Sequence, residues 1–112
     1  MELRHIRYFL AVAEEMNFTR AAEKLCIAQP PLSRQIQELE AELGTKLFVR
    51  KPHALQLTEE GILFRQYAQQ IVDLVKRSAE DVSEMEKGLQ GMIYLASVEG
   101  QAPALLSEWI AG

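Results

Sequence analysis

Cysteine, histidine and aromatic residues are scarce in this chain of 112 residues: it has one cysteine, two histidines and 7% aromatics. The single thiol of Cys26 cannot form an internal disulfide. One cysteine and two histidines are also too few for a Cys/His metal cluster. The apolar runs are a few residues long, far below the roughly 20 that span a bilayer, and the start has no signal-peptide core. We therefore expect a protein of the reducing cytoplasm, with no metal site and no membrane segment.

Glycine-rich loops and catalytic pairs are also missing. The six glycines, at positions 44, 61, 88, 91, 100 and 112, form no loop that could cradle a phosphate. Neither histidine has a nucleophile or metal ligand near it in the sequence. Cys26 falls in an apolar stretch, where we interpret it as a small buried residue rather than a nucleophile. These absences argue against an enzyme and against a bound cofactor.

Basic charge is not in excess, because the net charge is −4. This average argues weakly against a nucleic-acid partner. Residues 1–58, however, hold eight Lys or Arg and seven Asp or Glu, whereas residues 59–112 hold four and nine. A polyanion such as DNA would therefore meet the first half of the chain.

Two helices and a tight turn are predicted before residue 29. Apolar residues recur at helical spacing over residues 3–15, which indicates one face of an amphipathic helix. Asn and Thr at 17–19 are good N-cap residues for a short second helix over 20–25. The apolar residues 26–28 then predict a tight, buried turn.

A third helix is predicted from Gln29 to residue 43. Pro30 and Pro31 fit its first turn, where an absent N–H costs nothing, and Gly44 supplies the stop. Its inward face is formed by four apolar residues, Leu32, Ile36, Leu39 and Leu43.

The opposite face of this third helix carries hydrogen-bonding side chains. Pro30, Arg34 and Gln37 lie there at 100° per residue, Ser33 lies near its edge, and acidic residues are confined to the C-terminal half. Such a face is often merely solvated. A short helix, a tight turn and this helix nevertheless match a helix-turn-helix, whose second helix enters the major groove. Arg and Gln side chains can bind guanine and adenine edges there.

Residues 46–57 predict a β-hairpin, or wing. Strand-like residues at 46–50 and an alternating stretch at 55–57 flank a basic turn. Arg50, Lys51 and His53 lie at its tip, where they can contact the DNA backbone or the minor groove. An exposed turn position without a specific contact is the alternative for His53, and His5 fits a surface or capping position.

A long helix is predicted from the N-cap Thr58 to about Lys87, with its end near Gly88 or Gly91. Spacings of four and three alternate along it, a heptad stripe typical of helices that pair. The stripe comprises Phe64, Ala68, Ile71, Val75, Ser78, Val82, Met85 and Leu89. We therefore predict a homodimer through this helix, which would place two recognition helices on an inverted-repeat operator. The alternative is a helix that packs only on its own domain.

The last residues predict a buried strand over 92–98 and the start of a helix over 104–111. One strand and a short helix cannot build a core of their own. The predicted organisation is thus 1–58 for a DNA-binding domain, 59–90 for a linker helix and 91–112 for the start of a further domain.

The chain resembles LysR-type transcriptional regulators at residues 3–9, 17–22, 26–36 and 57–61. The similarity runs in register from residue 1 to about 90. It implies a mainly α fold, namely a winged helix-turn-helix with a two-stranded β wing followed by a long dimerisation helix. It also implies a dimeric bacterial regulator that binds double-stranded DNA. Residues 91–112 would then begin an effector-binding domain that is almost entirely absent, so a small-molecule inducer is expected only for a full-length protein.

The resemblance also implies roles for individual residues. On the recognition helix, the side chains near DNA would be Gln29, Pro30, Pro31, Ser33, Arg34 and Gln37. Thr19 and Arg20 would lie near phosphate on the preceding helix, and Arg50 would serve the wing. The chain departs from the family at Ala28, where many relatives carry a capping serine. Its wing also lacks the second arginine that is often found there, and Lys51 and His53 are the candidates to replace it.

A protein-interaction module is the competing class. In that interpretation the winged helix supports a coiled-coil dimer and DNA binding is incidental. The acidic net charge favours it slightly, whereas the non-acidic outer face of the third helix disfavours it. Competitor-resistant binding to one duplex would distinguish the two classes.

Overall fold

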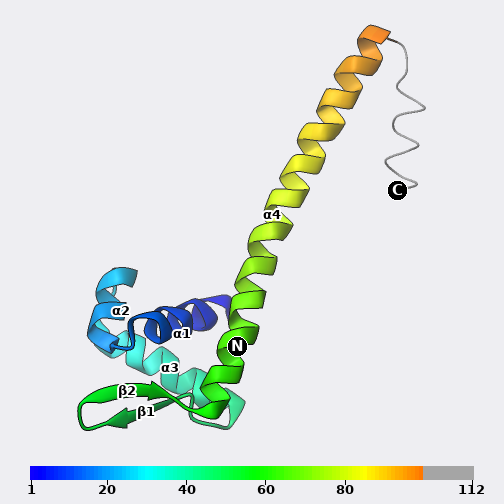
Figure 1. Cartoon of the computed structure of the whole chain (residues 1–112). Coiled ribbons are helices and arrows are strands. Elements are labelled where there is room, and N and C mark those ends of the chain that lie inside the picture. Colours follow the sequence, from blue (N-terminus) through cyan, green and yellow to red (C-terminus); the bar gives the residue numbers. More distant parts are fainter. Residues whose placement is uncertain (100–112) are drawn as a thin grey trace. The chain divides into compact units, whose positions relative to one another are not determined.

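The computed structural model describes the backbone of residues 1–99 and the side chains of residues 1–88. Its elements, in chain order, are α1 (Leu3–Glu15), α2 (Phe18–Leu25), α3 (Gln29–Leu43), β1 (Phe48–Lys51), β2 (Ala54–Leu57) and α4 (Glu59–Glu99). The helices α1, α2 and α3 pack against one another, and β1 and β2 form an antiparallel hairpin (Figure 1). The predicted mainly α fold with a two-stranded wing and a long last helix is confirmed.

The helix boundaries follow from local capping, mostly as predicted. The Asn17 side chain accepts a hydrogen bond from the backbone N–H of Arg20 at 2.9 Å, which caps α2. Gly44 ends α3 in the left-handed conformation, at φ +73°. Ala28 precedes α3 without a side-chain cap, because its methyl group accepts no hydrogen bond.

The turn between α2 and α3 is less buried than predicted. Cys26 is exposed, Ala28 is exposed and only Ile27 packs partly against the core. The reason is the C-terminal cap of α2. Cys26 adopts the left-handed conformation at φ +59°, and the N–H groups of residues 26 and 27 bond back to the Glu23 and Ala22 carbonyls. This cap satisfies the backbone without burying the thiol, so the interpretation of Cys26 as a buried residue was wrong.

The core of residues 1–74 is built from the inner faces of the three short helices and the base of the wing. Its fully buried large side chains are Phe9, Val12, Leu32, Leu39 and Leu47. Phe9 lies at the centre, with ring centroids 5.3 Å from Phe48 and 5.0 Å from Phe64. The predicted inward stripe of α3 is confirmed, since Leu32, Ile36 and Leu39 are buried and Leu43 packs half-buried against the core.

The start of α4 is part of this same core. Thr58 caps the helix as predicted, because its hydroxyl oxygen accepts the N–H of Gly61 at 2.9 Å. Phe64 packs against Phe9, and Ala68 is completely buried. The chain divides into two compact units at residues 74 and 75, and α4 contributes to both.

The far end of α4 corrects two predictions. The helix does not stop at Gly88 or Gly91 but continues to Glu99, so residues 92–98 are helical rather than a strand. A strand needs a partner to satisfy its backbone groups, whereas a helix satisfies them internally. An isolated glycine within a helix costs only about 1 kcal/mol. The predicted helix over 104–111 lies outside the described residues.

Candidate nucleic-acid interface

The exposed face of α3 lies opposite its buried stripe. Pro30, Pro31, Arg34 and Gln37 are all exposed, as the helical periodicity predicts. Gln29 and Ser33 are half-buried and joined by a hydrogen bond of 2.8 Å from the Gln29 amide to the Ser33 hydroxyl. This bond fixes two polar side chains one helical turn apart at the N-terminal end of α3.

The wing presents its two basic residues on opposite faces. Arg50 pairs with Leu55, and Lys51 pairs with Ala54. Because side chains alternate along a strand, Arg50 shares a face with Phe48, which packs into the core, and Lys51 lies on the other face. The Arg50 guanidinium carbon lies 4.9 Å from the ring centroid of Phe18, the first residue of α2. Arg50 thus faces the helix-turn-helix.

An open hollow of about 360 Å³ joins the wing to the starts of α2 and α3. Five of the predicted DNA-binding residues line it, namely Thr19, Gln29, Arg50, Lys51 and His53. Ser33 and Gln37 line a second hollow, again with Arg50. Arg20, Pro30, Pro31 and Arg34 line neither hollow but are exposed on the same two helices.

The basic side chains of residues 1–58 divide into two groups. Arg4 pairs with Glu2, Lys24 with Glu14 and Glu15, and Lys46 with Glu40. The hydrogen bond from Lys24 to Glu14 and the two nearby carboxylates raise the pKa of Lys24. The cations predicted to meet DNA have no carboxylate partner among the described residues; they are Arg20, Arg34, Arg50 and Lys51. Their charge is thus available to an external anion. Arg7 of α1, which is not among the predicted DNA contacts, has no carboxylate partner among the described residues either.

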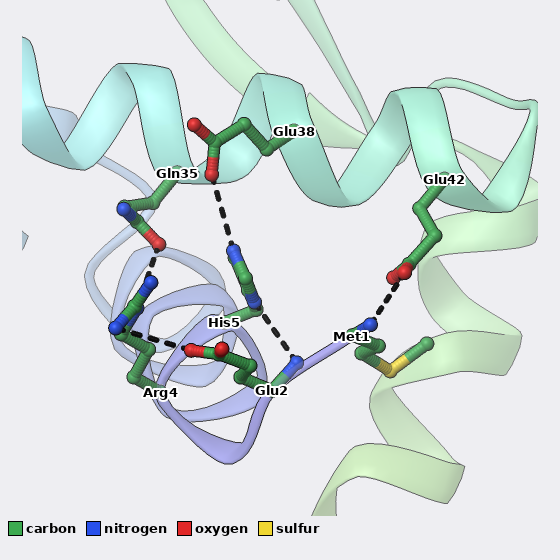
Figure 2. A network of polar contacts seen from close by, with 7 residues as sticks. All are labelled: Met1, Glu2, Arg4, His5, Gln35, Glu38 and Glu42. Carbon is green, nitrogen blue, oxygen red and sulfur yellow. Dashed lines mark hydrogen bonds and ion pairs between the residues drawn. The ribbon is translucent and has the colours of Figure 1, made fainter.

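Two acidic side chains of α3 form polar contacts with residues at the start of the chain. The Met1 amino group pairs with Glu42, and His5 lies 3.3 Å from Glu38 (Figure 2). The Nδ1 atom of His5 accepts the N–H of Glu2 at 3.0 Å, so its Nε2 atom is the donor to Glu38. The sequence left a surface position and a capping position open for His5. The structure shows a capping residue, and this residue is buried.

Glu40 has a role that sequence reasoning missed. Its side chain is buried, and one carboxylate oxygen accepts the N–H groups of Leu47 at 2.7 Å and Phe48 at 3.3 Å. These bonds tie the start of β1 to α3. The partners lie seven and eight residues downstream, beyond the end of the helix, so helical periodicity contains no signal of them.

Two other features, a membrane-spanning helix and a metal site, are not found in the described part of the chain. No helix there is both long and apolar enough to cross a bilayer. Within the same residues, no three His, Cys, Asp or Glu side chains cluster as metal ligands.

A short helix, a tight turn, a helix with a polar outer face and a basic hairpin together define a winged helix-turn-helix protein. The family model for bacterial regulatory helix-turn-helix proteins of the lysR family matches residues 3–62. The chain belongs to the lysR family, as its sequence resemblance implied.

Relatives of known sequence and structure agree with this assignment. The transcriptional regulator BenM of Acinetobacter baylyi is 51% identical over 100 residues, which cover 83% of this chain and 33% of BenM. A crystal structure of the BenM DBD with catB site 1 DNA matches with a TM-score of 0.73 and 53% identity, covering 76% of this chain and 96% of that one. The CbnR DBD–DNA complex matches with a TM-score of 0.72 and 41% identity, covering 76% and 98%. The chain thus spans about a third of the length of BenM.

Proposed function

We propose that this chain is the DNA-binding part of a LysR-type transcriptional regulator and that it binds a specific duplex as a dimer. The observation that carries this proposal is that Arg20, Arg34, Arg50 and Lys51, exposed on the helix-turn-helix and wing, have no carboxylate partner among the described residues. The DNA complexes of BenM and CbnR domains with the same fold support it. No observation favours catalysis, and a regulator of bacterial DNA would act in the cytoplasm.

In this proposal α3 enters the major groove by its N-terminal half. Arg34 and Gln37 are exposed there and carry the donors and acceptors that distinguish base edges. Gln29 and Ser33 stand beside them, and Pro30 and Pro31 form the surface that approaches the duplex. The pairing of Glu42 with the Met1 amino group reduces the repulsion that the acidic half of α3 would exert on phosphates.

Phosphate contacts come from two places in this proposal. Thr19 and Arg20 are exposed in the first turn of α2, where the helix dipole also favours an anion. Lys51 and His53 lie at the wing beside the same hollow. Such contacts supply affinity and salt dependence, whereas base contacts supply selectivity.

Dimerisation is assigned to α4, with a change in the predicted stripe. Phe64 and Ala68 pack in the core of their own domain, which leaves other residues of the first turns to face a partner. Leu63, Tyr67 and Leu74 are exposed by 55%, 56% and 59%. Ile71, Val75, Val82 and Met85 of the predicted stripe are exposed too, and the side chain of Leu89 lies outside the described residues. Exposed apolar residues at heptad spacing favour a second helix as partner.

Selection of bound duplexes from a randomised pool, at near-physiological salt, tests the proposal. We expect one enriched motif with two inverted half-sites. A single enriched half-site would support base recognition by α3 but contradict binding as a dimer. No enrichment by folded protein would contradict the proposal and favour the interaction module.

A further inference from the structure

Arg50 is held on the inner face of the wing by an aromatic ring. Its guanidinium carbon lies 4.9 Å from the centroid of the Phe18 ring, within the range of a cation–π contact. Arg50 belongs to β1 and Phe18 to the first turn of α2. One contact therefore joins the wing to the helix-turn-helix.

Phe18 is itself fixed by the core. Its ring lies 5.9 Å from that of Phe48 at 64°, and the Phe48 ring lies 5.3 Å from that of Phe9. Phe9 is fully buried, so three rings lead from the centre of the core to the guanidinium. An arginine whose guanidinium lies over the last ring of such a series has fewer accessible rotamers than a free surface arginine.

The hydrogen-bonding capacity of Arg50 remains unused within the described residues. Its side chain has no ion pair or hydrogen bond there, in contrast to Arg4, which bonds to Gln35 and Glu2. The N–H donors of a guanidinium lie in the plane of the group. Arg50 lines the hollow that Thr19, Gln29 and Lys51 also line.

We propose that Phe18 is a positioning residue, which holds the Arg50 guanidinium so that its N–H edge can bind a phosphate of bound DNA. The inference rests on the proposed function. It adds that Phe18, an apolar residue without a DNA contact of its own, sets affinity by preorganising Arg50. Lys51 lines the same hollow but has no cation–π contact with Phe18 among the described residues, so we expect its contribution not to depend on Phe18.

A double-mutant cycle tests this dependence. The probe is the duplex recovered by selection with the unchanged chain, and the variants are Phe18→Leu, Arg50→Ala and the double variant. Because Arg50 is exposed, we expect Phe18→Leu to weaken binding about three- to fivefold, in the range of an exposed cation–π contact. In the Arg50→Ala background, the same change should weaken binding less than about twofold, because the group that Phe18 positions is gone.

The matched control is a second cycle with Lys51→Ala. Phe18→Leu should retain its full effect there, because the Phe18 ring contacts the guanidinium of Arg50 and not Lys51. Phe18→Tyr, which keeps an aromatic face under the guanidinium, should recover most of the lost affinity. In the free protein, the NMR shift of the Arg50 Nε–H group should change in Phe18→Leu and be retained in Phe18→Tyr.

Two results would overturn the inference. One is equal effects of Phe18→Leu with and without Arg50, which would make Phe18 a core residue only. The other is a folded Phe18→Tyr protein that binds as weakly as Phe18→Leu, with folding judged by thermal unfolding. An unchanged chain that enriches no duplex would instead refute the proposed function, and the inference with it.

Discussion

Gly61 and Leu47 approach so closely that a Cβ atom on Gly61 would stand 2.2 Å from the carbonyl oxygen of Leu47. The same oxygen accepts the N–H of Thr58 at 3.0 Å, and the Thr58 hydroxyl donates to the carbonyl of Lys46 at 2.7 Å. The first turn of α4 is therefore fastened to the segment that enters the wing. Only glycine allows this approach.

Replacing Gly61 by alanine should therefore destabilise the domain. Alanine favours a helix over glycine, but the new methyl group would collide with backbone atoms, which cannot rotate away. We expect a net loss of about 1–3 kcal/mol in the free energy of unfolding, measured by urea denaturation. Gln66→Ala, at an exposed position of the same helix, is the control and should change stability by less than about 0.5 kcal/mol. A Gly61→Ala protein as stable as the parent would show that the two segments separate easily.

Glu40 should be the acidic residue on which the wing depends most. Glu40→Ala leaves the buried N–H groups of Leu47 and Phe48 without their acceptor. A buried unpaired donor costs about 1–3 kcal/mol, and we expect a loss of that size in urea denaturation. Glu40→Gln keeps an acceptor and should cost less. The control is Glu23→Gln, at an exposed site of α2; an equal loss there would point to a general charge effect.

The starts of α2 and α4 and the end of α3 could be predicted because their signals are local. Asn17, Thr58 and Gly44 act through backbone groups within a few residues, and the apolar spacing of α3 identifies its buried face. Glu40 and His5 could not be placed in the same way. Their partners lie across a turn or on another helix, and a sequence does not show which polar side chains such packing brings together.

The long helix shows a second limit of sequence patterns. The spacings of four and three placed Phe64 and Ala68 in the same apolar stripe as the later residues. Such a pattern does not show whether a residue packs in the core of its own domain or against a partner helix. The structure places these two in the core. Residues 92–98 are apolar enough for a strand, yet no periodicity separates a short buried strand from a helix.

The caps of α2 and α3 predict opposite effects of two substitutions. Asn17→Ala removes the acceptor for the N–H of Arg20 and should cost about 1 kcal/mol. Ala28→Ser offers α3 a cap that it lacks and should stabilise the domain by about 0.5–1 kcal/mol. Thermal unfolding of both variants beside the parent checks the prediction. A serine at 28 without effect would mean that the ends of α3 are already satisfied by solvent.

The proposed pairing of α4 predicts that a charge at Leu74 weakens the dimer. Leu74 is 59% exposed in the single chain, so Leu74→Glu should leave the fold intact. In a helix pair it would bury an unpaired carboxylate, and we expect the dimer dissociation constant to rise at least about tenfold. Sedimentation equilibrium measures this constant. Gln70→Glu adds the same charge at an exposed polar site and is the control. An unchanged constant for Leu74→Glu would remove this face of α4 from the interface.

Arg34 and Lys51 should differ in what they contribute to DNA binding, although both are exposed and unpaired among the described residues. Arg34→Ala should cost about 1–3 kcal/mol on the selected duplex and relax the preference at one base position. Lys51→Ala should weaken all duplexes alike and lower the salt slope by about one. Titrations with single-base variants of the duplex, at three salt concentrations, separate these effects. Uniform weakening by Arg34→Ala would make Arg34 a phosphate contact, and an unchanged salt slope for Lys51→Ala would place that side chain away from the DNA.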